Sequence, residues 1–288
     1  MHHVAGPEGP ALRGKDTSYR TFVEYLGDRY GMQLERLSVD ERFNPGIGFV
    51  RRTDIRRSAG QLRFSPRTKR FTTVRKFSWT GSGAYIENSA GRVESREQAV
   101  EFGIEYQSAD TLTFSYADLY EFVPRPFRIA SDVTVPVGGY DTETVAMNYT
   151  FGPQRKVVVG LNAEFGTFYS GHRTALSATR GRMNLGPRFS LEPTYSVNRV
   201  NLREGSFTTH LAGSRVTYTM TPQMFASSLV QFNSSNNAVT ANVRLRWEYQ
   251  PGSELFVVYN DERDTRARGF PDLATRSFIV KVNRLFRF

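Results

Sequence analysis

The 288-residue sequence predicts an all-β fold, an antiparallel transmembrane β-barrel of roughly 14–16 strands. Three observations lead to this prediction. Polar and apolar residues alternate with a period of two along most of the chain, turn residues separate the alternating segments, and the last segment ends on an aromatic residue. The segments are about 10–14 residues long, which is the length that a tilted strand needs to cross a bilayer.

The composition excludes several other classes. The chain contains no cysteine, which excludes a disulfide scaffold and any cysteine-based metal or redox centre. It has no run of about 18 apolar residues, so no transmembrane helix is expected. Aromatic residues make up 13% of the chain, which is too much apolar surface for disorder along its whole length.

The alternation is clearest at residues 239–250, where all twelve positions match a strand pattern. Leu245 and Trp247 fall on one face of this strand, and Arg244 and Arg246 fall on the other. The same period recurs in four further segments: 100–106, 144–151, 157–165 and 188–198.

Turn residues divide the chain into hairpins. Gly27 and Asp28 separate residues 17–26 from residues 29–39. Longer irregular segments are expected to be loops at 40–55, 84–96, 123–139 and 262–273.

Alternation alone also fits a soluble β-sandwich, in which one face packs a core and the other meets water. Long strands, aromatic residues near strand ends and charged residues in the middle of strands favour the membrane barrel. We therefore expect apolar, lipid-facing or girdle positions at Trp247, Tyr249, Phe286 and Phe288.

Basic residues on the opposite face are candidates for the barrel lumen. They are Arg188, Arg244, Arg246, Lys281 and Arg287. The formal net charge of +10 allows a positive lumen that favours anions. The alternative is an interior in which carboxylates pair with these cations, with Glu105, Glu164, Glu192 and Glu248 as partners.

The last strand, SFIVKVNRLFRF at residues 277–288, alternates and ends at Phe288. Bacterial outer-membrane barrels end in this way, and we expect this strand to be read by the barrel assembly machinery. Residues 1–16 are expected to be a disordered tail, and residues 17–288 a single outer-membrane barrel domain.

Five segments resemble a family of outer-membrane proteins in which a family-nine-like carbohydrate-binding module precedes a C-terminal β-barrel domain of unknown function. They are FNPGIGFVRR (Phe43–Arg52), LRFSPR (Leu62–Arg67), VTVPVGGY (Val133–Tyr140), RLRWEYQPGSELFVVYNDERD (Arg244–Asp264) and SFIVKVNRLFRF (Ser277–Phe288). The resemblance implies an outer-membrane barrel. Nothing in the chain matches the carbohydrate-binding module, and residues 1–16 show no secretory signal, so the start is expected to be internal or the barrel N-terminally truncated.

Catalytic and ligand-binding motifs find little support. Ser170 with His172, or Ser214 with His210, could be named for an outer-membrane hydrolase, but a girdle or turn histidine is the stronger interpretation. The acidic run Asp261–Asp264 hints at calcium, although mixed charge in a loop is usually solvated. No enzyme, cofactor or metal site is predicted. No nucleic-acid partner is predicted either, because the basic residues are spread over many strands.

The sequence therefore predicts a channel-like or anchoring barrel of a bacterial outer membrane. Its expected partners are outer-membrane lipid, the assembly machinery and, through an upstream module, surface glycan. The alternatives are a lipase-like or glycosidase-like barrel hydrolase and a soluble β-sheet carbohydrate-binding protein.

Overall fold

The computed structural model describes residues 16–266 and 269–286. In the first part of the chain the strands are β1 (Ser18–Leu26), β2 (Tyr30–Val39), β3 (Ile55–Phe64), β4 (Val74–Glu87), β5 (Val93–Tyr106), β6 (Thr111–Val123), β7 (Phe127–Ala130) and β8 (Val133–Val135). The remaining strands are β9 (Gly138–Thr150), β10 (Val157–Phe168), β11 (Gly171–Asn184), β12 (Phe189–Leu202), β13 (Gly205–Thr221), β14 (Met224–Asn233), β15 (Ala238–Gln250), β16 (Ser253–Asp264) and β17 (Asp272–Asn283).

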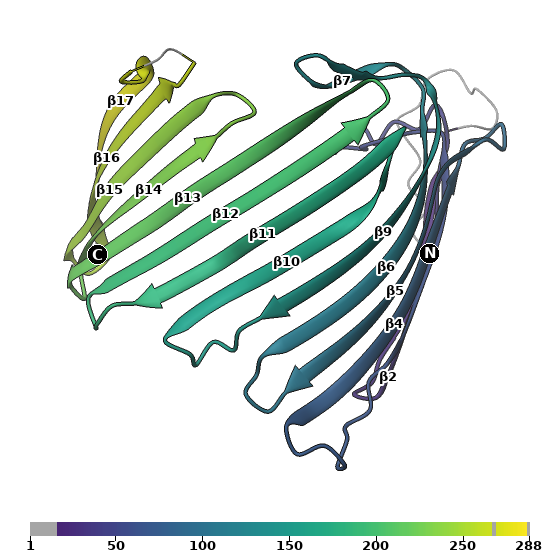
Figure 1. The fold of residues 1–288 in the computed structure, drawn as a ribbon, viewed down its shortest axis with the longest axis horizontal. Coiled ribbons are helices and arrows are strands. Elements are labelled where there is room, and N and C mark those ends of the chain that lie inside the picture. The colour runs from purple at the N-terminus through teal and green to yellow at the C-terminus, as the bar shows by residue number, and fades with distance from the viewer. Residues whose placement is uncertain (1–15, 267–268, 287–288) are drawn as a thin grey trace. The chain divides into compact units, whose positions relative to one another are not determined.

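Fifteen strands form one sheet in the order β1 to β6 and then β9 to β17, so strands that follow one another in this sequence are neighbours (Figure 1). Every strand pair whose register is described is antiparallel. The strands β7 and β8 pair separately, within the segment that connects β6 to β9. The predicted all-β, antiparallel fold with roughly 14–16 strands is confirmed. Among the described residues there is no helix with the length and hydropathy to cross a membrane.

The chain divides into two compact units. Unit 1 comprises Met1–Met147, Glu164–Arg173 and Asn201–Gly205, and unit 2 comprises Asn148–Ala163, Thr174–Val200 and Ser206–Phe288. The single barrel domain at 17–288 stays a prediction, and the expected tail falls, apart from Asp16, outside the described residues.

Three of the predicted loops are shorter in the structure. The loop expected at 84–96 is confined to residues 88–92, because the Asn88 side chain accepts hydrogen bonds from the backbone of Ala90 and Arg92 and closes a tight turn. The segment at 123–139 contains the β7–β8 pair, and β16 and β17 extend into the loop expected at 262–273, to Asp264 and from Asp272. Residues 40–54 form a loop, as predicted.

The terminal strand begins and ends five residues earlier than predicted. It ends at Asn283, and Leu285 beyond it donates its backbone N–H to Ser253 Oγ at 3.0 Å. The expected alternation therefore does not continue as a strand through Phe286, while Phe288 lies outside the described residues.

Few side chains are buried in either unit. The buried hydrophobic residues of the described chain are Val39, Val74, Val123, Val133, Val135, Val200 and Ala238. Many larger apolar side chains are exposed instead, so the fold is held by its strand ladders without a packed core of large side chains.

Candidate functional site

The register of unit 2 sorts its side chains into two faces, because residues directly opposite in an antiparallel pair point to the same side. Leu245 lies opposite Ala226 on β14 and Val257 on β16, and Val257 lies opposite Val280 on β17. These residues, together with Val243, Trp247, Phe278 and Val282, define the apolar face of unit 2.

The apolar face of unit 2 has no covering layer in the structure. Trp247 is 43% exposed, Val280 54% and Phe278 67%. Exposed side chains of this size on neighbouring strands form a continuous apolar patch, and such patches mark a surface that meets a partner or a lipid phase.

The opposite face carries three of the predicted lumen residues. Arg244 lies opposite Val258, and Arg246 lies opposite Phe256, which in turn lies opposite Lys281. This polar face of unit 2 also contains a side-chain ladder in which Asn242 bonds Asn260, and Asn260 donates to Ser277 Oγ at 2.9 Å.

The cations of this polar face are matched by carboxylates. Arg246 donates from Nε to Glu254 Oε1 at 2.9 Å and lies 5.9 Å from the ring centroid of Phe225. On β13–β17 the register places four cations on the polar face, Arg215, Arg244, Arg246 and Lys281, against five carboxylates, Glu248, Glu254, Glu262, Asp264 and Asp272. By this count the polar face of unit 2 does not carry a net positive charge.

The other predicted positions are placed as follows. Arg188 lies in the turn between β11 and β12, where its carbonyl accepts the Thr219 N–H at 2.8 Å. Tyr249 sits at a bulge next to Trp247, with ring centroids 6.0 Å apart, and its hydroxyl donates to the Asn283 carbonyl at 3.0 Å. Phe286 follows β17 and is exposed, and Arg287 lies outside the described residues.

Unit 1 is two-faced in the same way. Its polar face centres on Glu35, which accepts a hydrogen bond from Arg20 Nε at 2.7 Å and pairs with Arg57 on the next strand. A hollow of about 210 Å³ lies beside this carboxylate, lined by Phe22, Arg57, Ser82 and Glu97 among others. On β1–β6 the register places four cations on this face, Arg20, Arg57, Arg63 and Lys76, and six carboxylates, Glu24, Glu35, Glu97, Glu101, Glu105 and Glu121.

The apolar face of unit 1 carries a row of aromatic rings. Tyr30, Phe64, Trp79, Phe102 and Phe114 lie opposite one another on β2 to β6. Successive ring centroids are 5.3 Å apart for Tyr30–Phe64, 5.8 Å for Phe64–Trp79 and 5.2 Å for Trp79–Phe102. We call this row the aromatic belt of unit 1. Sequence reasoning named a girdle elsewhere in the chain and missed this one, because its rings come from five strands that only the register aligns.

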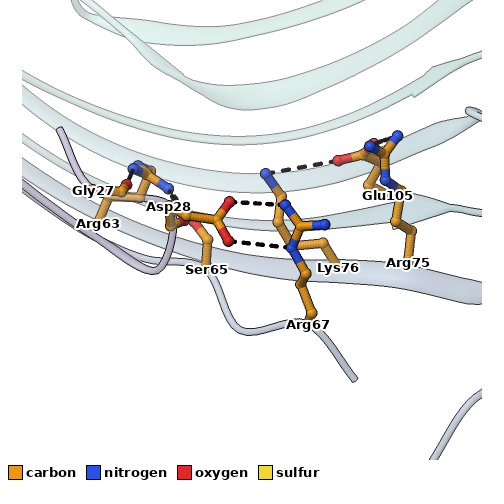
Figure 2. A network of polar contacts seen from close by, with 8 residues as sticks. All are labelled: Gly27, Asp28, Arg63, Ser65, Arg67, Arg75, Lys76 and Glu105. Carbon is orange, nitrogen blue, oxygen red and sulfur yellow. Dashed lines mark hydrogen bonds and ion pairs between the residues drawn. The ribbon is translucent and has the colours of Figure 1, made fainter. Parts of the chain in front are cut away.

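A polar network lies at the end of the strands next to this belt (Figure 2). Arg63 donates to the Gly27 carbonyl at 2.6 Å and to Ser65 Oγ at 2.6 Å, which fixes the β1–β2 turn to the end of β3. Arg67 pairs with Asp28 across the same turn. Farther along, Glu105 at the end of β5 pairs with Arg75 at 2.8 Å and Lys76 at 3.7 Å at the start of β4 (Figure 2).

The network shifts the pKa values of its exposed ion pair, Asp28 and Arg67. The hydrogen bond and positive charge of Arg67 hold the pKa of Asp28 below its ordinary value. The same contact raises the pKa of Arg67. Sequence reasoning did not single out this site, although the run Pro66–Arg70 carries three cations and no carboxylate.

The structure does not assemble the serine–histidine pairs considered from the sequence. Ser170 donates to Glu204, and its Oγ accepts the Arg203 N–H at 3.2 Å. His210 Nδ1 bonds the Tyr195 hydroxyl at 2.9 Å, and Ser214 lies four residues away along the same strand, about 13 Å at ~3.3 Å per residue.

The acidic run Asp261–Asp264 belongs to strand β16, so the prediction of a loop there was wrong for these residues. Asp261 pairs with Arg263 at 2.6 Å and with Arg276 on β17 at 2.9 Å. Its oxygens are thus occupied by guanidinium groups, and the described residues contain no group of three or more His, Cys, Asp or Glu suited to a metal ion.

Comparison with known proteins gives structural matches alone. No protein-family model matches the chain, and no curated protein matches it. Among solved structures, the chain is similar to one described as "Asymmetric conductivity of engineered proteins", with a TM-score of 0.27 and 9% identity over 86% of this chain and 95% of the other. It is also similar to a triple mutant of the Rh. blastica porin, with a TM-score of 0.26 and 10% identity over 92% of this chain and 98% of the porin. At these scores the function has to be argued from the chain's own residues.

Proposed function

We propose that the chain is a transmembrane β-barrel protein of a bacterial outer membrane that acts as a channel-like or anchoring barrel. The observation that carries this proposal is the pair of faces on each unit. One face exposes rows of apolar and aromatic side chains, and the other carries paired charges and amide ladders.

Water is a poor environment for the apolar faces. Burying a side chain such as Phe or Val contributes about 1.5–3 kcal/mol relative to leaving it in water, and dozens of such groups are exposed here. A soluble β-sandwich would pack these faces against protein. Lipid is the partner that suits an apolar band with an aromatic row at its edge.

The polar faces suit a lumen of mixed charge. Four cations stand against five carboxylates on β13–β17, and four against six on β1–β6. These faces therefore carry net charges of −1 and −2, and the net charge of +10 arises from residues outside them. A pore lined in this way would pass small ions with weak selectivity, or would be filled by its own ion pairs.

The narrower proposals rest on the resemblance noted for the sequence. It supports a barrel that serves surface glycan binding or uptake through a carbohydrate-binding module upstream. It also supports insertion by the barrel assembly machinery, guided by the C-terminal segment Ser277–Phe288. Replacing Phe288 with Ala should slow assembly into membranes that contain the machinery and leave unassisted refolding into micelles unchanged.

The test of the main proposal is refolding of the full chain from urea, in plain buffer and into thin-lipid vesicles. A β-rich species that forms only with lipid, and whose gel mobility changes on heating, is the expected result. A folded, soluble β-protein in plain buffer would overturn the proposal. Conductance steps in a planar bilayer would then separate a channel from a closed anchor.

A further inference from the structure

The apolar face of unit 1 contains a groove that leads to the aromatic belt. One hollow of about 660 Å³ is lined by Gly60, Gly81 and Gly83 together with Leu62 and Val100. A second hollow of about 470 Å³ shares Leu62, Gly81 and Val100 with the first and is walled by rings of the belt. The two hollows therefore adjoin.

Glycines open the groove, because Gly81 and Gly83 leave the space of a side chain empty on β4, whereas a Cβ added at Gly60 would lie 3.2 Å from Leu34 Cδ2. Gly60 lies opposite Gly83, and Gly81 lies opposite both Leu62 and Val100. A Cβ added at Gly81 would meet no atom within 4 Å, and one at Gly83 would meet only the Glu97 carbonyl at 3.8 Å. From Gly60 to Phe64 on β3 the groove extends over four residues, about 13 Å.

Cations stand at the end of the groove next to the belt. The Arg29 guanidinium lies 5.6 Å from the ring centroid of Tyr30 and 5.3 Å from that of Phe64, and both rings line the second hollow. Arg70 lies 6.0 Å from the ring of Phe71, which contacts Phe77 at the edge of the belt. Within the described residues, neither Arg29 nor Arg70 has a carboxylate partner, whereas Arg67 and Arg75 do.

The charge of this end favours an anion. The segments 27–29, 65–76 and 105–110 carry six cations, Arg29, Arg67, Lys69, Arg70, Arg75 and Lys76, against three carboxylates, Asp28, Glu105 and Asp110. A ligand that suits the site thus has a long apolar part for the groove and an anionic group for the arginines.

We propose that this groove is a seat for an anionic glycerophospholipid, with an acyl chain over Gly81 and Gly83 and the phosphate at Arg29. The inference rests on the proposed function, since it needs the apolar face of unit 1 to meet the membrane. It goes further by selecting one class of lipid at one place. The aromatic rings wall the chain, and Arg29, which stacks on two of them, holds the headgroup at the depth where phosphates lie.

The two tryptophans allow a test within one molecule. Trp79 lines the groove and is 42% exposed, while Trp247 lies on the apolar face of unit 2 and is 43% exposed. The variants Trp247→Phe and Trp79→Phe each leave one tryptophan as a reporter. Both are refolded into phosphatidylcholine vesicles that contain, at equal mole fraction, either brominated phosphatidylglycerol or brominated phosphatidylcholine, and quenching of fluorescence is measured.

Trp79 should be quenched more by the anionic brominated lipid than by the neutral one, with an enrichment of about fivefold for each cation that contacts the phosphate. Trp247 should be quenched equally by both lipids. In the variant that keeps Trp79, Arg29→Gln should lower the enrichment about fivefold. Gly81→Leu should abolish the enrichment by filling the groove. Ala226→Leu, on the apolar face of unit 2, is the matched control for added bulk and should change nothing.

Two failures remain distinguishable. Equal quenching of Trp79 by both lipids, or an enrichment unaffected by Arg29→Gln and Gly81→Leu, overturns the lipid seat and leaves the membrane barrel in place. A tryptophan that neither brominated lipid quenches overturns the proposed function itself. Glycerol 3-phosphate, which has the headgroup without chains, should not reduce the enrichment, and competition by it would overturn the role of the groove.

Discussion

Asp28 and Arg67 form a two-point ion pair, in which Arg67 Nη2 donates to Oδ1 at 3.0 Å and Nε donates to Oδ2 at 3.2 Å. The pair joins the β1–β2 turn to the segment that leads into β4, two places 39 residues apart in the sequence. Both side chains are exposed, so the contribution of the pair to stability is small and sensitive to salt.

The Asp28–Arg67 pair predicts a small acid-dependent loss of stability. Because Arg67 lowers the pKa of Asp28 in the folded chain, the pair stabilises the fold above the ordinary aspartate pKa, and this stabilisation is lost as the pH falls through the lowered value. Asp28→Asn should therefore lower the unfolding midpoint in micelles slightly at pH 7 and leave it unchanged near pH 2. Glu41→Gln, at an exposed loop position, is the control, and an equal effect of Asp28→Asn at both pH values would contradict the prediction.

A second prediction separates the two faces of β15. Leu245→Arg places a charge in the middle of the apolar face and should cost ~2–4 kcal/mol of folding free energy in vesicles. Arg244→Leu, on the neighbouring residue of the polar face, should cost much less. Urea titration of both variants in the same vesicles measures the difference, and equal costs would contradict the assignment of the faces.

Gly205 at the start of β13 gives a third prediction. Its φ is +146°, and an added Cβ would lie 2.9 Å from Cγ2 of Val133, a buried residue of β8. Gly205→Ala should destabilise the chain by ~1–3 kcal/mol through backbone strain, with a further cost from the clash. Gly186→Ala, where φ is +94° and no atom lies within 4 Å, isolates the strain.

Thermal unfolding in micelles measures both glycine variants. Adding Val133→Ala to Gly205→Ala should relieve the clash but not the backbone strain. The double variant should therefore lose less stability than the sum of the losses of the two single variants. Strictly additive costs would show that Val133 does not oppose the new methyl group.

The faces of the sheet could be predicted from the sequence, but the contacts between strands could not. A period of two assigns Leu245 and Arg244 to opposite sides whatever the neighbouring strands are. The ion pairs of Glu35 depend on the register that sets Arg20 and Arg57 beside it, and alternation leaves the register undefined by steps of two residues. The same ambiguity concealed the aromatic belt and the glycine groove, since each takes its residues from several strands.

The end of the terminal strand shows a second limit. The alternation of SFIVKVNRLFRF is interrupted at Arg284 and resumes at Phe286, and the strand stops just before the interruption, at Asn283. The Leu285 N–H donates to the side chain of Ser253, 32 residues earlier in the chain, and alternation does not record this contact.

The balanced charge of the polar faces predicts how ions would pass. The wild-type chain should show weak ion selectivity in a planar bilayer under a tenfold potassium chloride gradient, in spite of its net charge of +10. Arg246→Gln leaves the Glu254 carboxylate without its guanidinium partner and should shift the reversal potential toward that of potassium. Glu254→Gln should shift it toward that of chloride.

Arg276→Gln is the control. It also removes one positive charge, but from the apolar face, where Arg263 still pairs with Asp261, and should leave the reversal potential unchanged. Each of the three substitutions changes the charge of the chain by one unit. If the reversal potential shifts for Arg246→Gln and Glu254→Gln but not for Arg276→Gln, the polar face is the wall of the conducting path. Equal shifts for Arg246→Gln and Arg276→Gln would contradict that role.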